Sequence, residues 1–232
     1  MSYVVMQRTL EMLDKHHRDG AAFAAMMKEG FAQRFGPEFW EEWERIVGPA
    51  LGGTPQIMDL GAGPGLLVKV LAERYPAGRV YGVECAPYML EAVEGLPGNA
   101  EIVVQDLHDP RLPCADGSVD AVFTSMVLHE MSQPVKAMRE VARCLKPGGV
   151  LLVHDWVRVP LAQYLAQQEK ELRAFDPAAS AEELDDLFIH FVEHNRFSAD
   201  DLAYMLEATG FQVKESRLLR DGAQARIAAV KR

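Results

Sequence analysis

The 232-residue sequence predicts an α/β protein built on a doubly wound, mostly parallel β-sheet. From residue 55 to about 157, short β-branched apolar runs of strand length alternate with segments of helical periodicity. Strands that alternate with helices imply right-handed crossovers, and hence a parallel sheet covered by helices on both faces. The composition, 49% hydrophobic and 25% charged, is that of a globular protein with a sizeable core.

Residues 1–50 are predicted to form a helical cap that precedes a main domain over 51–232. Apolar residues in this segment recur three and four positions apart, with a break at Gly36-Pro37. Five aromatic residues recur there at near-helical spacing: Phe31, Phe35, Phe39, Trp40 and Trp43. We expect them to pack the cap against the main domain, and a share in an apolar substrate pocket is the alternative.

The middle of the chain supplies the parallel part of the expected sheet. Apolar runs predict five strands, at 56–60, 79–84, 100–104, 119–125 and 149–156. Helical periodicity occupies the segments between them, at 65–75, 87–96 and 133–149. Sheets of this kind bind ligands at the carboxyl ends of their strands.

The last third of the chain is expected to add an insertion and a hairpin. Residues 158–197 are predicted to form a helical insertion that lids the substrate site, and Ser198 is a plausible N-cap for the next helix. Two further strands are expected at 211–219 and 225–232. A short turn around Asp221-Gly222 joins them, so they should pair as an antiparallel hairpin.

Charge and cysteine content narrow the classes of partner. The net charge of -10 argues against a nucleic acid as the main partner. No apolar run approaches the ~18 residues that a membrane helix requires, and the N-terminus is too polar for a signal peptide. The cysteines Cys85, Cys114 and Cys144 are isolated and odd in number, which predicts neither a disulfide framework nor a metal site. We expect a soluble, cytoplasmic protein.

The sequence MDLGAGPG, residues 58–65, places three closely spaced glycines after the first expected strand. Glycines at such a turn allow chain reversal and a close approach of a ligand to the backbone. A dinucleotide fingerprint would be GxGxxG, but Leu66 stands where its third glycine belongs, which disfavours NAD and FAD. The loop also lacks the GK[ST] of a nucleoside triphosphate site.

Acidic residues end three of the expected strands or follow them directly. Asp59, Glu84 and Asp106 stand at or just after the carboxyl ends of the first, second and third strands. A carboxylate at the end of the second strand can accept hydrogen bonds from both hydroxyls of a ribose. The acid series together with the glycine loop therefore indicates a nucleoside-containing ligand.

These motifs resemble those of the class I S-adenosylmethionine-dependent methyltransferases. The resemblance covers about residues 55–156 and rests on MDLGAGPG, YGVECAPYML, VVQDL, LPCADGSVDAVFTSMVLHEM and REVARCLKPGGVLLVHDW, in that order. The subgroup that the sequence most resembles contains the ubiquinone and menaquinone C-methyltransferases. The resemblance implies S-adenosylmethionine as cofactor and a seven-stranded sheet in the order 3-2-1-4-5-7-6, with strand seven antiparallel.

The resemblance also implies roles for residues at the first two strands. Gly61, Gly63 and Gly65 would lie against the methionine part and the ribose of the cofactor. Asp59 would orient this loop or meet the cofactor's ammonium group through water, and Glu84 would hold the ribose hydroxyls.

Further implied contacts come from the next strands. Cys85 would lie beside the sugar or the adenine. Asp106 would accept a hydrogen bond from the adenine amino group, while the Leu107 amide meets a ring nitrogen. The backbone near Ser125 and Met126 would contact the methionine portion.

Methyl transfer is an in-line displacement, so the protein mainly aligns the nucleophile and excludes water. A general base is needed only where the nucleophile must lose a proton. Two histidines at strand ends are candidates, His129 after the fourth strand and His154 in the fifth. The alternative for both is a pocket or core histidine without a proton role. Trp156 is a candidate wall of the substrate pocket or a packing residue.

The insertion carries two further histidines. His190 and His194 are candidate substrate-site residues on a helix that would lid the site. Residues 190–194 also match the H-x-x-E-H pattern of a zinc peptidase group, but the surrounding fold belongs to another chemistry, so we expect no metal. The alternative is a partly buried amphipathic helix.

The function expected from the sequence is methyl transfer from S-adenosylmethionine to a small, partly apolar molecule. A regulatory protein that binds the cofactor without turnover is an alternative, and a nicotinamide oxidoreductase is another, which Leu66 disfavours. Nucleic-acid methylation is disfavoured by the acidic charge and by TSMVLHEM, which replaces an Asn/Asp-Pro-Pro-Tyr/Phe motif. The oligomeric state is left open, a homodimer included.

Overall fold

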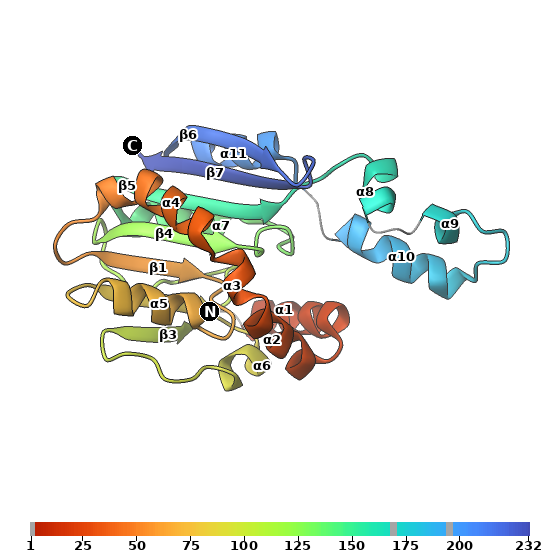
Figure 1. Cartoon of the computed structure of the whole chain (residues 1–232), viewed down its shortest axis with the longest axis horizontal. Helices are drawn as coiled ribbons and strands as arrows, with labels where there is room; N and C mark the ends of the chain where they lie inside the picture. Colours follow the sequence, from red (N-terminus) through yellow and green to blue (C-terminus); the bar gives the residue numbers. More distant parts are fainter. Residues whose placement is uncertain (1–2, 168–170, 194–196) are drawn as a thin grey trace.

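The computed structural model describes residues 3–167, 171–193 and 197–232. Its centre is one seven-stranded sheet in the order β3-β2-β1-β4-β5-β7-β6 (Figure 1). The strands are β1 (Gln56–Leu60), β2 (Arg79–Glu84), β3 (Ala100–Val104), β4 (Val119–Ser125), β5 (Leu145–Trp156), β6 (Phe211–Leu219) and β7 (Gln224–Lys231). Strands β1 to β5 pair in parallel, whereas β7 pairs antiparallel with both β5 and β6. The sheet order and the antiparallel seventh strand are confirmed.

Helices cover both faces of the sheet, so the central strands are buried on both sides. One face carries α4 (Pro37–Ile46) and α5 (Leu66–Arg74), whose apolar residues pack with alternate residues of the strands. The opposite face carries α7 (Val135–Cys144) and α11 (Ala199–Ala208). These two apolar clusters are the layers that a doubly wound sheet requires.

Local signals fix several helix ends. Ser198 caps α11, because its hydroxyl accepts from the Asp201 N–H at 3.1 Å while the Asp201 carboxylate accepts from the Ser198 N–H at 2.8 Å. Helix α7 ends at Cys144, earlier than expected, because Leu145 already pairs with Val119 of β4. The strand expected at 149–156 therefore begins four residues sooner.

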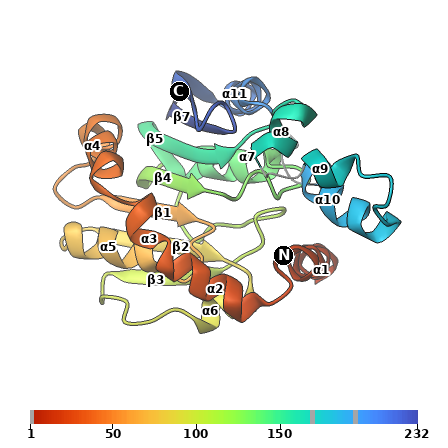
Figure 2. The ribbon, with the colours of Figure 1, turned by 45° about the vertical axis from the view of Figure 1, so that its right-hand side comes forward.

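The cap consists of α1 (Tyr3–His17), α2 (Gly20–Glu29), α3 (Phe31–Arg34) and α4, followed by the short 3-10 helix η1 (Gly48–Ala50). Helices α1 and α2 lie beyond the carboxyl ends of the parallel strands, next to α6 (Pro87–Glu91) (Figures 1 and 2). Asp19 caps α2 by accepting from the Ala22 N–H at 3.0 Å. The chain thus passes from the carboxyl ends of the strands, where α1 and α2 lie, to one face of the sheet, where α4 packs.

Aromatic side chains join the cap to the sheet. Trp43 is fully buried, and its indole N–H donates to the Tyr75 hydroxyl at 2.9 Å. The rings of Phe39 and Phe123 meet at 5.5 Å between centroids, nearly edge to face. The expected packing role of the cap aromatics is confirmed, since Phe39 and Trp43 belong to the apolar cluster on this face and Phe31, Phe35 and Trp40 pack against it.

The insertion holds α8 (Leu161–Gln167), α9 (Glu171–Ala174) and α10 (Ala181–Glu193). It projects beyond the carboxyl end of β5 (Figure 1) and has an apolar cluster of its own, which includes Tyr164 and Leu187. Trp156 packs against this cluster. Within the three described segments, no helix combines the length and the apolar character that a membrane crossing needs.

The prediction that the cysteines are isolated is wrong for two of them. Cys114 and Cys144 form a disulfide, with their Cα atoms 6.0 Å apart. They come from the loop before β4 and from the end of α7, which the fold brings together although 30 residues separate them. Disulfides are typical of oxidising compartments, so cysteine usage no longer supports the expected cytoplasmic location.

Trp43→Ala should destabilise the protein by about 3–5 kcal/mol, because truncation of a buried tryptophan leaves a cavity between the cap and the sheet. Urea unfolding of the wild type and the variant measures this difference. Met26→Ala is the control, since half of that side chain is exposed and its loss should cost under about 0.5 kcal/mol. Similar stabilities of Trp43→Ala and the wild type would mean that the cap does not share the core.

Candidate functional site

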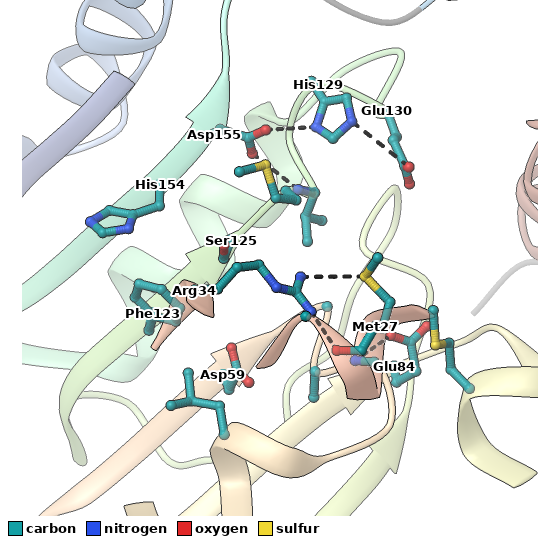
Figure 3. A pocket seen from close by; sticks show the side chains of 18 of the residues that line it. Met27, Arg34, Asp59, Glu84, Phe123, Ser125, His129, Glu130, His154 and Asp155 are labelled. Atoms are coloured by element: carbon teal, nitrogen blue, oxygen red, sulfur yellow. Dashed lines mark hydrogen bonds and ion pairs between the residues drawn. The ribbon is translucent and has the colours of Figure 1, made fainter. Parts of the chain in front are cut away.

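A cavity of about 1260 Å³ lies at the carboxyl ends of the parallel strands. Its walls come from the cap helices, the glycine loop after β1 and the ends of β2, β4, β5 and β7. Figure 3 shows part of it, with the Arg34 side chain reaching between the strand ends. The position agrees with the rule that open α/β sheets bind ligands beyond the carboxyl ends of their strands.

The glycine loop needs glycine for both conformation and space. Gly61 has φ 69° and Gly63 has φ 54°, in the left-handed region that side chains disfavour. A Cβ atom on Gly61 would lie 2.1 Å from the Cγ2 atom of Val127. Gly65, at φ 75°, starts α5 and lies against Val93 and Ile102 instead of lining the cavity.

The Glu84 carboxylate ties the glycine loop to the end of β2. One oxygen accepts from the Gly63 N–H at 2.8 Å, and the other accepts from the Cys85 and Ala86 N–H groups at 2.7 and 2.8 Å. Burial raises the pKa of Glu84, and these three backbone donors act in the opposite direction. The carboxylate lines the cavity, so its remaining lone pairs can accept ligand hydroxyls.

Asp59 and Arg34 both line the cavity. Burial, aided by the charge of Glu84, raises the pKa of Asp59 to about 8, while Arg34 acts against this shift. The Arg34 guanidinium donates to the Met27 carbonyl oxygen at 2.7 Å and lies 3.3 Å from the Met27 sulfur, both neutral groups. Sequence reasoning missed Arg34, because nothing in the cap sequence sets this arginine apart from others.

Asp106 is fully buried and is reached by the first cap helix. Its carboxylate accepts from the Thr9 hydroxyl at 2.9 Å and from the His108 N–H at 2.9 Å. Burial alone would raise the pKa of Asp106, but the hydrogen bonds from His108 and Thr9 outweigh it and lower the pKa. Helix α1 therefore closes the end of the cavity at β3. Thr9, 97 residues away in sequence, was not predicted.

His129 is paired with a buried carboxylate. Its Nδ1 atom lies 2.6 Å from an oxygen of Asp155, whose other oxygen accepts from the Val127 and Leu128 N–H groups at 3.1 and 2.6 Å. Burial opposes protonation of His129, yet the charge of Asp155, the hydrogen bond to it and the charge of Glu130 together raise its pKa. An imidazole held in one orientation by a carboxylate is suited to general-base catalysis.

A chain of polar side chains extends from this pair to the cap. The His129 Nε2 atom lies 3.8 Å from the Glu130 carboxylate, which is 3.1 Å from His17 Nε2. The other nitrogen of His17 contacts the Tyr88 hydroxyl. His17 ends α1 and Tyr88 belongs to α6, so this series of polar contacts fastens the cap over β4. Glu130, Asp155 and His17 were not among the site residues predicted from the sequence.

His154 has a different environment from His129. Neighbouring side chains of a strand alternate in direction, and Figure 3 shows His154 and Asp155 on opposite sides of β5. The His154 ring lies edge to face with Phe123 and Phe39, at 5.5 and 6.1 Å between centroids. Burial lowers its pKa to about 4, so it is neutral at physiological pH. Its Nε2 atom has no hydrogen-bond partner among the described residues.

The cavity brings together most of the predicted site residues. Those that line it are Asp59, Gly61, Gly63, Glu84, Cys85, Asp106, Leu107, Ser125, Met126, His129, His154 and Trp156. His194 and the side chain of His190 lie outside the described residues. No described residue of helices α8 to α10 lines the cavity, and the insertion meets the cap through Glu193, which is paired with Lys15 at 2.8 Å. A lid role of the insertion stays a prediction.

Comparisons with known proteins agree with this geometry. Residues 58–153 match the family model described as "Methyltransferase domain". A demethylmenaquinone methyltransferase of Tropheryma whipplei is 29% identical over 198 residues, which cover 79% of this chain and 78% of that protein. An uncharacterized 37.1 kDa protein in transposon TN4556 of Streptomyces fradiae is 39% identical over 123 residues, which cover 49% of this chain and 35% of that protein. The chain thus matches only about a third of the latter relative's length.

A solved structure shares the fold over nearly the whole chain. It is the complex between the Haloferax volcanii Trm112 methyltransferase activator and a methyltransferase, with a TM-score of 0.66 and 18% identity. The alignment covers 92% of this chain and 97% of the matched one. Residues 58–153 therefore carry a methyltransferase domain. The fold is also shared with an S-adenosylmethionine-dependent methyltransferase of Aquifex aeolicus, with a TM-score of 0.53 and 21% identity over 78% of this chain and 83% of the matched one.

Asp155→Asn should lower the pKa of His129 from above its ordinary value of 6.5 to below it, because burial then acts without the carboxylate charge. In the wild type, the raised pKa contributes stability that is complete below about pH 6.5 and is lost as the pH rises through the folded-state pKa. NMR titration of the imidazole resonances measures the shift.

Glu130→Gln is the control for this titration, since Glu130 is the weaker influence and should move the pKa of His129 less. An unchanged His129 pKa in Asp155→Asn would contradict the assigned pairing.

Proposed function

We propose that this protein transfers a methyl group from S-adenosylmethionine to a small, partly apolar molecule. The observation that carries the proposal is the placement of Glu84 and Asp106 at successive strand ends, on the wall of one cavity with the glycine loop. The Glu84 carboxylate lies next to the bared backbone of this loop, and the Asp106 carboxylate lies one strand further along the sheet, an arrangement that matches the hydroxyl and amino donors of an adenosine.

The residues around the cavity fit the cofactor in charge as well as in shape. Glu84 would accept from the ribose hydroxyls and Asp106 from the adenine amino group. Arg34, whose guanidinium has only neutral hydrogen-bond partners among the described residues, would meet the carboxylate of the methionine portion. Gly61 and Gly63 leave room for the ligand beside the backbone. When bound, S-adenosylmethionine supplies the activated methyl group, and the chain aligns the acceptor and excludes water.

His129 is the better of the two candidate bases. Asp155 holds its Nδ1 atom at 2.6 Å, which leaves the Nε2 side of the ring toward the cavity and Glu130. Asp155 also raises the pKa of His129, which makes the neutral imidazole a stronger base. His154, with a pKa near 4, is a weak base, and its position among aromatic rings supports a role in binding.

The acceptor is proposed to be small because cap helices form part of the cavity wall and because the volume of about 1260 Å³ has to hold the cofactor as well. Aromatic and aliphatic side chains supply much of the wall, among them Phe35, Phe39 and Phe123. The name of the Tropheryma whipplei relative, a demethylmenaquinone methyltransferase, supports an acceptor with an apolar body. A cofactor-binding regulatory protein is the remaining alternative, and it would bind S-adenosylhomocysteine without methylating any acceptor.

Glu84→Gln should weaken S-adenosylhomocysteine binding more than tenfold, because a carboxylate that accepts ribose hydroxyls contributes on the order of 1.5–3 kcal/mol. Calorimetric titration measures the affinity. In thermal melts, S-adenosylhomocysteine at a hundredfold excess over its dissociation constant should stabilise the wild type by about 2.7 kcal/mol, which raises the Tm by roughly 5 to 11 °C. NADH should leave the Tm unchanged.

Glu101→Gln is the matched control, because Glu101 lies on β3 in an exposed ion pair with Arg79 and should leave the affinity unchanged. Equal S-adenosylhomocysteine affinities of Glu84→Gln and the wild type would refute the assigned ribose site.

Arg34→Met should weaken S-adenosylhomocysteine about tenfold and leave 5′-methylthioadenosine binding within twofold, because only the first ligand carries the amino-acid carboxylate. The ratio of the two dissociation constants, measured by calorimetry, isolates this contact. Arg45→Met is the control, since Arg45 pairs with Glu215 on the surface. A uniform loss for both ligands would assign Arg34 to the packing of the cap alone.

A further inference from the structure

We propose that the part of the cavity between α4 and the β5–β7 pair is the acceptor subsite, and that Gln224 with His154 binds an oxygen of a flat, uncharged acceptor. The inference rests on the proposed function and deepens it, because it names the residues that select the acceptor. Gln224 was not among the residues predicted from the sequence.

The sheet register places these side chains on one face. In the antiparallel β5–β7 pair, Trp156 lies opposite Gln224 and His154 lies opposite Arg226. Directly opposed residues point to the same face of a sheet, as do residues two apart along a strand. Ser125 of β4 is in register with His154, so it extends the same surface toward the glycine loop. The subsite is therefore continuous with the proposed cofactor site.

Two buried polar atoms in this region lack partners. Gln224 is only 8% exposed and lines the cavity, and its side-chain nitrogen makes no hydrogen bond with any described residue. The same holds for the Nε2 atom of His154. A buried amide without a partner destabilises a fold, whereas an apolar residue of equal size would not. Two such atoms on one cavity wall, at diagonally related positions of the β5–β7 pair, indicate a ligand that satisfies them.

The surrounding side chains define the shape and charge of that ligand. Phe35, Phe39 and Phe123 line the cavity beside His154, and their rings provide flat apolar walls. Trp156 closes the subsite next to Gln224, and the Arg220 guanidinium lies 5.8 Å from its ring centre. Aromatic walls of this kind favour a planar ring system as the bound group.

Among the described residues on this face of the subsite, Arg226 is the one buried cation, and two carboxylates balance its charge. The Arg226 guanidinium contacts the Glu42 carboxylate from α4 and lies 2.5 Å from the Glu215 carboxylate of β6. Burial keeps His154 neutral, with a pKa near 4. Arg220 also lines the cavity, but from an exposed position. Deeper in the subsite, beside His154, an ionised acceptor group would therefore find no free opposite charge among the described residues, whereas a carbonyl or hydroxyl oxygen can accept from the Gln224 amide.

The test compares two probes of nearly the same shape, 1-acetonaphthone and 1-ethylnaphthalene, of which only the first carries a carbonyl oxygen. Ligand-observed NMR gives both dissociation constants, with the protein saturated with S-adenosylhomocysteine and again without it. The wild type should bind the ketone about tenfold tighter than the hydrocarbon. Gln224→Leu should bring the two constants within threefold of each other and leave S-adenosylhomocysteine affinity within twofold.

Matched variants guard against indirect effects. Gln212→Leu makes the same substitution at an exposed position of β6 and should keep the tenfold preference. Gln224→Met, with an unbranched side chain, replaces Gln224→Leu if the latter melts well below the wild type. A His154→Phe variant should weaken the preference while keeping the aromatic wall.

The outcomes separate the two proposals. No ketone preference in the wild type, or an undiminished preference in a folded Gln224 variant, overturns the subsite even where S-adenosylhomocysteine binds. A preference that depends on Gln224 supports the subsite, and its persistence in a protein that binds no S-adenosylhomocysteine would refute the proposed function alone.

Discussion

The site depends on one carboxylate, that of Glu84, which accepts hydrogen bonds from the N–H groups of Gly63, Cys85 and Ala86. These bonds join the glycine loop after β1 to the turn after β2, so two loops distant in sequence form one surface. Charge-assisted bonds to backbone amides are stronger than neutral ones, which suits a position where the loop adopts left-handed conformations. The groups that would hold the adenosine portion of the cofactor are thus positioned before any ligand arrives.

The cap helices complete the cavity whose other walls come from the strand ends of the sheet. It reaches the strand ends at three points, through the Thr9 contact with Asp106, the His17 contact with Glu130 and the Arg34 side chain above Asp59. The first two contacts bring a polar side chain of α1 to a carboxylate in the loop after β3 or β4, whereas Arg34 of α3 acts on the Asp59 carboxylate through its charge. Because the cap also shares the apolar core through α4, the stability of the fold and the closure of the cavity depend on the same helices.

The sequence predicted the sheet well and the contacts across it poorly. Apolar runs and glycine turns are local signals, so the strands, the hairpin at Asp221-Gly222 and the Ser198 cap could be read directly. Gln224 and Thr9 could not be found in this way, because their importance arises only when distant segments meet. The Cys114–Cys144 disulfide was missed for the same reason.

The most direct test of this account is a crystal structure of the protein with S-adenosylhomocysteine. The account predicts the ribose hydroxyls within about 3.2 Å of the Glu84 carboxylate and the adenine amino group within the same distance of Asp106, beneath α1. A ligand bound elsewhere, or an adenosine whose ribose does not contact Glu84, would contradict the assignment of this cavity as the methyl-donor site.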